Sequence, residues 1–139
     1  MLTGFTFGLF DLFHVGDLDL LRQSAARCDR LVVGAYTDEL AEHTWRSTPY
    51  VPLAERLDIL ANLRFVDDVI ALSSLDIPAA AEAVAADLVM VGPGRDGTPT
   101  ADQLSQSLTG IGVVTIEPKA ETGSPILRQA LDADWTAVA

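Results

Sequence analysis

In the stretch GLFDLFHVGDLDLL, near the N-terminus, Asp11, His14 and Asp17 are of types that could act on a phosphate group. Gly8 and Gly16 flank them, and glycine allows a backbone to approach a ligand closely. A histidine at the start of a helix can donate a hydrogen bond to phosphoryl oxygens as charge grows on them. The same histidine is also a common helix-capping or packed residue, so this turn alone does not separate the two roles.

Asp17 places a negative charge where a phosphate would bind, and two interpretations of it stay open. In the first, which we place ahead, the carboxylate stabilises the first helical turn by ~0.3 to 1 kcal/mol. In the second, Asp11 and Asp17 together hold a magnesium ion, which prefers carboxylate and phosphate oxygens. Without a metal, a like charge ~4 Å from a phosphate costs about 1 kcal/mol in water and about 4 kcal/mol near a protein surface.

The elements that would position these residues alternate along the chain. Short, nearly continuous apolar runs such as LVVGAY, DLVMV and VVTI are typical of parallel strands covered on both faces. The strands are expected over residues 2–7, 31–36, 66–72, 87–91 and 113–117. Segments of helical period predict helices over residues 16–27, 52–63, 77–86, 101–108 and 124–131. Strand and helix in alternation predict an α/β fold, a single doubly wound parallel sheet of about five strands with helices on both faces and right-handed crossovers.

Doubly wound sheets bind ligands at the carboxyl ends of their strands, near the point where the strand order reverses. The candidate loops there are residues 8–15, 37–48, 92–99 and 118–123, and three of these four contain glycine. An acidic protein that binds an anion must gather its few cations locally. Arg95 and Lys119, which lie in two of these loops, are therefore stronger candidates for contact with an anionic ligand.

The composition narrows the class of protein. With 139 residues, the chain has the length of one domain, and 49% hydrophobic residues argue against disorder. The net charge of −11 and only nine scattered basic residues exclude nucleic acid as a partner. Cys28 is a single cysteine and cannot form an internal disulfide. The apolar runs are too short for a membrane span and the N-terminus lacks a secretory pattern, so we expect a soluble, cytoplasmic protein without a membrane partner.

The stretch from Gly8 to Asp17 resembles the G-x-F-D-x-x-H-x-G-H signature of small cytidylyltransferases of the glycerol-3-phosphate cytidylyltransferase type. It matches at every position except the last, where Asp17 stands for the second histidine. LVVGAYTDE, VPLAERLDIL, LRFVDDVI and ETGSPILRQAL resemble further segments of that family in the same order. The resemblance covers nearly the whole chain and implies one cytidylyltransferase-like domain over residues 1–139 with a Rossmann-like fold of the nucleotidyltransferase type.

The resemblance also implies a reaction, in which a nucleotidyl group moves from a nucleoside triphosphate to a small acceptor and pyrophosphate is released. CMP from CTP is the favoured group, the acceptor is a phosphorylated compound or an alcohol, Mg²⁺ enters with the nucleotide, and the protein is a homodimer. The resemblance implies catalytic roles for His14, Asp17 and Arg46, the last beside the position of a lysine of the family. It implies nucleotide-binding roles for Gly8, Leu9, Phe10, His14, Gly16, Gly92, Arg95, Lys119, Thr122 and Ser124. Asp11 and Arg56 are expected to bind the acceptor, and Asp11 and Asp17 are the metal pair.

Several positions depart from the pattern of the family. A Gly-Asp-Asp-Trp segment after the fourth strand reads GPGR here, ending in Arg95. The loss of donors predicts weak or altered activity with CTP and glycerol 3-phosphate. The alternative is a module that keeps the fold and binds a nucleotide for regulation. Arg95 could equally face solvent, Arg56 could pair with Glu55 or Asp58, and His43 and Trp45 could form an acceptor lid or pack on a neighbour.

Overall fold

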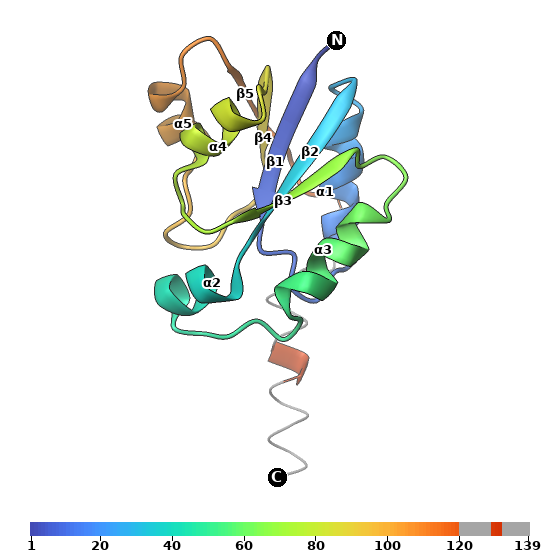
Figure 1. Ribbon diagram of the computed structural model, residues 1–139, viewed down its shortest axis with the longest axis vertical. Helices are drawn as coiled ribbons and strands as arrows, with labels where there is room; N and C mark the ends of the chain where they lie inside the picture. Colours follow the sequence, from blue (N-terminus) through green and yellow to red (C-terminus); the bar gives the residue numbers. More distant parts are fainter. Residues whose placement is uncertain (120–128, 132–139) are drawn as a thin grey trace.

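A computed structural model, in which residues 1–119 and 129–131 are described, contains one five-stranded parallel sheet with the order β3-β2-β1-β4-β5 (Figure 1). The strands are β1 (Thr3–Gly8), β2 (Arg30–Tyr36), β3 (Asp68–Leu72), β4 (Leu88–Val91) and β5 (Gly112–Thr115). In the middle of the sheet, Phe5 of β1 lies opposite Val32 of β2 and Val89 of β4. The predicted fold class is confirmed, and each predicted strand overlaps an observed one.

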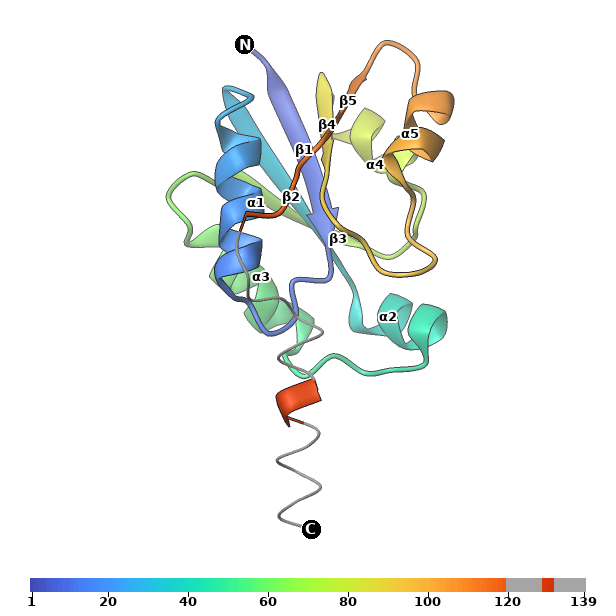
Figure 2. The ribbon, with the colours of Figure 1, turned by 180° about the vertical axis from the view of Figure 1, so that it is seen from behind.

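Helices cover both faces of the sheet, as expected. The helices are α1 (Val15–Ala25), α2 (Asp38–Trp45), α3 (Leu53–Ala61), α4 (Ile77–Ala83) and α5 (Ala101–Ser107). Figures 1 and 2 show α1 and α3 on one side of the sheet and α4 and α5 on the other. One buried cluster joins Leu21 of α1 and Leu60 of α3 to β2 and β4, and a second joins Ile77 of α4 and Leu104 of α5 to the opposite face. In the described ranges, no helix is long and apolar enough to cross a membrane.

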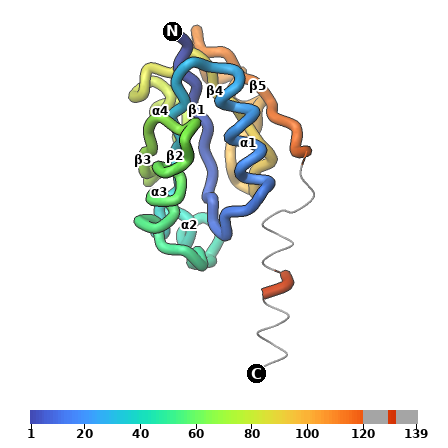
Figure 3. Tube along the Cα trace, turned by 90° about the vertical axis from the view of Figure 1, so that its right-hand side faces the viewer, coloured from blue at the N-terminus to red at the C-terminus, as the bar shows by residue number. Residues whose placement is uncertain are grey.

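The strand order reverses between β1 and β4. From β1 the chain proceeds outward through β2 to β3 and then crosses to β4, on the other side of β1. The loops that follow β1 and β4 therefore begin side by side at the carboxyl ends of two neighbouring strands. Figure 3 shows α2 at this end of the molecule, opposite the N-terminus.

The predicted loop over residues 37–48 is wrong in one respect, because it contains α2. Thr37 caps this helix, since its hydroxyl accepts a hydrogen bond from the Leu40 N–H at 3.1 Å. Asp38 and Glu39 follow in the first turn, where negative charge is favourable. The helix ends at Trp45, and the next residue, Arg46, has a left-handed φ of 56°. The helix expected over residues 124–131 lies largely outside the described residues.

Three aspartates at the amino ends of the strands form the same contact with the start of a neighbouring strand. Each pair has two hydrogen bonds. The backbone N–H of the aspartate donates to the backbone carbonyl of the partner residue, and the backbone N–H of that partner donates to the aspartate carboxylate. The pairs are Asp29 with Leu2, Asp67 with Leu31, and Asp87 with Thr3. They fix how adjacent strands begin relative to one another.

Candidate active site at the carboxyl ends of the strands

His14 is the N-cap residue of α1. Its Nδ1 accepts a hydrogen bond from the Gly16 N–H at 2.9 Å, so in its neutral form the ring carries its proton on Nε2. Nε2 lies 3.3 Å from Oδ2 of Asp17, and this oxygen also accepts the His14 backbone N–H at 3.2 Å. Both side chains form a capping box, so the capping roles considered for His14 and Asp17 are observed. The Nε2 proton is the group on His14 that can be offered to a ligand.

Asp17 is mostly enclosed, with 17% of its side chain exposed. Burial raises the pKa of its carboxyl from 3.8 to about 6, while the charge and the backbone N–H of His14 act in the opposite direction. The carboxyl is therefore still mainly ionised at neutral pH.

The loop between β1 and α1 contains strained backbone that its neighbours hold in place. Phe10 and Leu12 have φ values of 54° and 53°, in the left-handed region that costs non-glycine residues about 1 to 2 kcal/mol. Phe10 is buried, and a Cβ added at Gly8 would lie 3.2 Å from its ring, a closer contact than side chains usually make. Strain of this kind persists only when surrounding contacts over-determine the loop.

Asp11 supplies such contacts. It is 2% exposed, and its two carboxylate oxygens accept the N–H groups of Tyr50 and Val51, each at 2.9 Å. Asp11 thus fastens the connection between α2 and α3 to the β1 loop. Its carboxylate is held by backbone N–H groups of the protein itself, and its substrate-binding role stays a prediction.

The predicted metal pair of Asp11 and Asp17 has no support. Both oxygens of Asp11 are committed to backbone donors. In the part of the chain that the structure describes, no three His, Cys, Asp or Glu side chains form a group that could hold a metal ion. These residues do not fit a resident Mg²⁺, and magnesium remains an expectation attached to the triphosphate itself.

Arg56 lies inside the protein, rather than facing a substrate, facing solvent or pairing on its own helix. It is 1% exposed and donates to the carbonyls of Val51 at 2.9 Å, Leu9 at 2.8 Å and Tyr36 at 2.7 Å. Its remaining contact is an ion pair with Asp38 at 2.6 Å. One guanidinium therefore joins the end of β1, the end of β2, the start of α2 and the start of α3. In this geometry Arg56 positions the site, and the predicted contact with substrate is not available to it.

The loop after β4 lies against α1 and α2. A Cβ added at Gly92 would lie 2.9 Å from Leu20 of α1, so glycine permits this close passage. The guanidinium of Arg95 lies over the ring of Trp45, 4.6 Å from its centroid, and the Trp45 Nε1–H donates to the Asp96 carbonyl at 2.7 Å. Arg95 is therefore held on α2 at the carboxyl end of the sheet. Of the two roles considered for Trp45, an acceptor lid or packing on a neighbour, the structure shows packing against the loop after β4.

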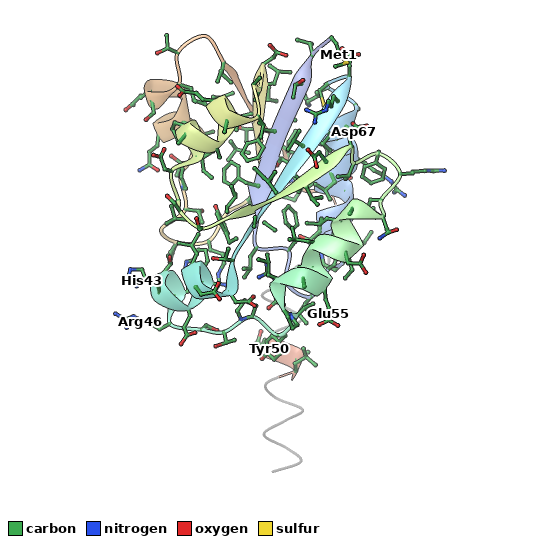
Figure 4. The ribbon with its side chains drawn as sticks, viewed as in Figure 1. Met1, His43, Arg46, Tyr50, Glu55 and Asp67 are labelled. Atoms are coloured by element: carbon green, nitrogen blue, oxygen red, sulfur yellow. The ribbon has the colours of Figure 1, made fainter. Side chains whose placement is uncertain are left out.

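The structure places the remaining predicted residues less closely together. Arg46 is exposed at the end of α2, and Figure 4 shows it with His43 on the outer side of that helix, directed away from the sheet. Lys119 is exposed, and its backbone N–H donates to the carboxylate of Asp19 on α1 at 3.1 Å. Thr122 and Ser124 lie outside the described residues. Their roles, and that of Arg46 in catalysis, stay predictions.

Two residues at this end were not singled out from the sequence. Asp38 pairs with Arg56, and its signal was the Thr-Asp-Glu order of a helix start directly after a strand. Tyr50 is 49% exposed at the same end of the molecule, with its backbone fixed by Asp11 (Figure 4). No pattern in the sequence distinguishes Tyr50 from an ordinary loop residue.

A protein-family model described as cytidylyltransferase-like matches residues 5–117. The chain belongs to this family. The family is of the nucleotidyltransferase type, and the two loops at the reversal of strand order lie within the matched range. The predicted recognition is confirmed at the level of the family.

Curated relatives match about half of the chain. The bifunctional protein HldE of Acidiphilium cryptum is 47% identical over 68 residues, which are 48% of this chain and 14% of that protein. A probable ethanolamine-phosphate cytidylyltransferase of Encephalitozoon cuniculi is 38% identical over 63 residues, 45% of this chain and 20% of that protein. The chain therefore matches only a small part of the length of either relative.

A solved structure supports the fold. The lipopolysaccharide core biosynthesis protein from Thermoplasma volcanium superposes with a TM-score of 0.73 and 24% identity. The match covers 88% of this chain and 99% of that one. At this identity the likeness shows the fold alone.

Proposed function

We propose that this protein transfers a nucleotidyl group, CMP from CTP being favoured, to a small phosphorylated or alcohol acceptor and releases pyrophosphate. The observation that carries the proposal is the position of His14 at the N-terminus of α1, where the strand order reverses between β1 and β4. The backbone N–H groups and the dipole of a helix N-terminus favour an anion. The name of the Encephalitozoon relative, an ethanolamine-phosphate cytidylyltransferase, supports a phosphorylated acceptor.

In the proposed reaction, an oxygen of the acceptor attacks the α-phosphorus, and the bond from this phosphorus to the bridging oxygen of the pyrophosphate breaks. Catalysis consists of positioning and of stabilising the charge that develops on the α-phosphate. His14 donates from Nε2 to a non-bridging α-phosphate oxygen, giving up its 3.3 Å contact with Asp17. Magnesium bound to the triphosphate would offset part of its negative charge.

The alternative function is a module that binds a nucleotide for regulation and has lost catalysis. It is favoured by Asp17, which replaces a second donor with a carboxylate that is mainly ionised at neutral pH. The commitment of Arg56 to four protein acceptors also removes a cation from the ligand side. Under either function we expect a cytoplasmic homodimer, and sedimentation at micromolar concentration tests the assembly.

Pyrophosphate release separates the two functions. The purified protein is incubated with Mg²⁺, each of the four nucleoside triphosphates, and acceptors that include glycerol 3-phosphate and ethanolamine phosphate. Release that depends on both substrates and is lost in His14→Asn supports the transferase. Binding of a triphosphate in a thermal-shift assay without release from any pair supports the regulatory module, and the absence of both binding and release rejects both functions.

A second variant tests the carboxylate. If the only effect of Asp17 is that it replaces the second histidine of the family, and with it a hydrogen-bond donor to phosphate, then Asp17→His should raise the affinity for the triphosphate. A lower affinity in this variant would show that Asp17 itself contributes to binding, through a metal or through its contact with His14.

A further inference from the structure

Trp45, the last residue of α2, makes three contacts with different parts of the carboxyl end of the sheet. Its ring packs against Tyr36, with 5.7 Å between centroids. The Arg95 guanidinium lies over the same ring, 4.6 Å from the ring centroid. The Nε1–H of Trp45 donates to the Asp96 carbonyl at 2.7 Å. The side chain of Trp45 is therefore the link between the end of β2 and the loop that follows β4.

This link passes over the end of β1. β1 lies between β2 and β4 in the sheet, and Phe7 of β1 packs against Tyr36 at 6.4 Å between centroids. The order of contacts is thus Phe7, Tyr36, Trp45 and Arg95. A row of rings and one cation spans the reversal of strand order, on the sheet face opposite the helix that His14 caps.

The loop after β4, residues 92–98, has a defined shape but an exposed course. The N–H and the hydroxyl of Thr98 both donate to the Arg95 carbonyl, at 3.1 and 2.7 Å. Gly97 has a φ of 91°, and residues 93–97 are exposed. A turn that closes on itself in this way still needs outside contacts to hold it at one position relative to α1. Trp45 supplies a hydrogen bond and a stacked cation for this purpose.

We propose that Trp45 is a positioning residue for the triphosphate, which acts by holding the 92–98 loop on α2 at the carboxyl end of the sheet. This inference rests on the proposed function, because it takes the 92–98 loop as the nucleotide side of the site. Trp45 itself touches no substrate. It sets how well the loop is ordered before the nucleotide arrives, and a preordered loop binds more tightly because less freedom is lost on binding.

The decisive variant is Trp45→Phe, which keeps a ring for Tyr36 and Arg95 and removes the Nε1–H. The Asp96 carbonyl is at an exposed position, where water solvates it once the donor is lost, so the variant should remain folded. The dissociation constant of the triphosphate, measured by titration calorimetry, should rise about 2- to 10-fold, the value of one net hydrogen bond. The KM of the acceptor should not change.

Arg95→Ala tests the stacked cation. It should weaken triphosphate binding about 2- to 5-fold, the value of an exposed cation–π contact. If both residues act through the loop, the double variant should lose less than the product of the two single effects. Arg27→Ala is the matched control, since it removes an exposed arginine next to the C-terminal end of α1, at the opposite end of the sheet.

A spectroscopic measurement gives a second readout. The chain contains two tryptophans, and in Trp135→Phe the emission comes from Trp45 alone. Adding CTP with Mg²⁺ should shift or quench this emission with the same dissociation constant as calorimetry reports, and adding an acceptor alone should not.

Three results would overturn the proposal. Unchanged triphosphate affinity in Trp45→Phe, in a protein whose parent binds the triphosphate, would show that Trp45 only packs, and the proposed function would stand. A rise in acceptor KM instead of triphosphate affinity would assign the loop to the acceptor. A parent that binds none of the four triphosphates would remove the proposed function and this inference with it.

Discussion

At the amino ends of the strands, Asp29, Asp67 and Asp87 are exposed, and each forms one reciprocal pair with the start of a neighbouring strand. At the carboxyl ends, Asp11 and Arg56 are buried, and each holds two or more segments through several hydrogen bonds. At the amino ends, each aspartate therefore fixes one strand start independently of the others. At the carboxyl ends, Asp11 and Arg56 form connected hydrogen bonds that join several segments.

The difference follows from what each end must hold. Strand starts need only alignment, and water solvates any polar group that is left over. The carboxyl end carries left-handed residues and converging carbonyls around a candidate ligand site, so its polar groups must be satisfied by the protein. We expect substitutions at the amino end to have small, additive effects and those at the carboxyl end to have large, coupled ones.

The largest effect is expected for Arg56→Met. It leaves the buried carbonyls of Leu9 and Tyr36 without their donor and removes the ion-pair partner of Asp38, whose side chain is 34% exposed. Each buried acceptor left without a partner costs about 1 to 3 kcal/mol, so the unfolding free energy measured by urea denaturation should fall by about 2 to 6 kcal/mol.

Arg30→Met is the control for Arg56→Met, because it removes an ion pair at 3.4 Å whose side chains are 36% and 54% exposed. Its cost should stay below about 1 kcal/mol. Similar losses in the two variants would contradict a distinction between the two ends of the sheet.

The next effect concerns chemistry at His14. His14→Ala should lower kcat by about 10²- to 10³-fold, as loss of a transition-state donor does, and should also lose about 1 kcal/mol of capping energy. His14→Asn separates the two roles, since asparagine is a good N-cap but lacks the imidazole. Full activity in His14→Asn, measured by pyrophosphate release, would reduce His14 to a cap.

Asp17 gives a pH dependence of intermediate size. Its folded pKa is raised from 3.8 to about 6, so the folded state favours the protonated carboxyl. The resulting stability is fully present below about pH 4 and is lost as the pH rises through about 6. About two pKa units correspond to up to about 3 kcal/mol. Unfolding free energies from pH 4 to 7 should show this fall in the parent and not in Asp17→Asn, and parallel curves would disprove the assignment.

The smallest effect is expected for Asp87→Ala, which removes one acceptor from the Thr3 N–H at 2.8 Å. The loss should be about 0.5 to 1.5 kcal/mol, measured by urea denaturation. Asp87→Asn keeps an acceptor and should lose less. Combining Asp87→Ala with Asp67→Ala should give the sum of the single losses, and a clearly larger combined loss would mean that the amino end is also a network.

The sheet was predictable because its strands are buried on both faces and therefore apolar throughout, as in LVVGAY and DLVMV. α2 was not predicted, although Thr37, Asp38 and Glu39 carry a helix-start pattern, because this segment was expected to be a ligand loop. Trp45 of this helix also packs against Tyr36 and bonds to the loop after β4, contacts that the sequence alone does not show.

The position of His14 at the ligand end could be predicted from its distance after β1 and from the glycines beside it. The roles of Asp11 and Arg56 could not. Their acceptors and donors are the backbone groups of residues 9, 36, 50 and 51, which converge only in the folded chain. A charged side chain near a phosphate signature looks the same in sequence whether it contacts a ligand or a carbonyl.

The strand order also has a consequence for the course of folding during synthesis. β1 pairs with β2, which follows it closely, but its other neighbour is β4, where Leu88 lies opposite Gly4. Pairs so distant in sequence form late because a long loop must close first. Until β4 emerges, β1 is an open edge able to pair with another chain. The half with His14 and Arg56 therefore assembles first, and the docking of β4 both closes the sheet and completes the site.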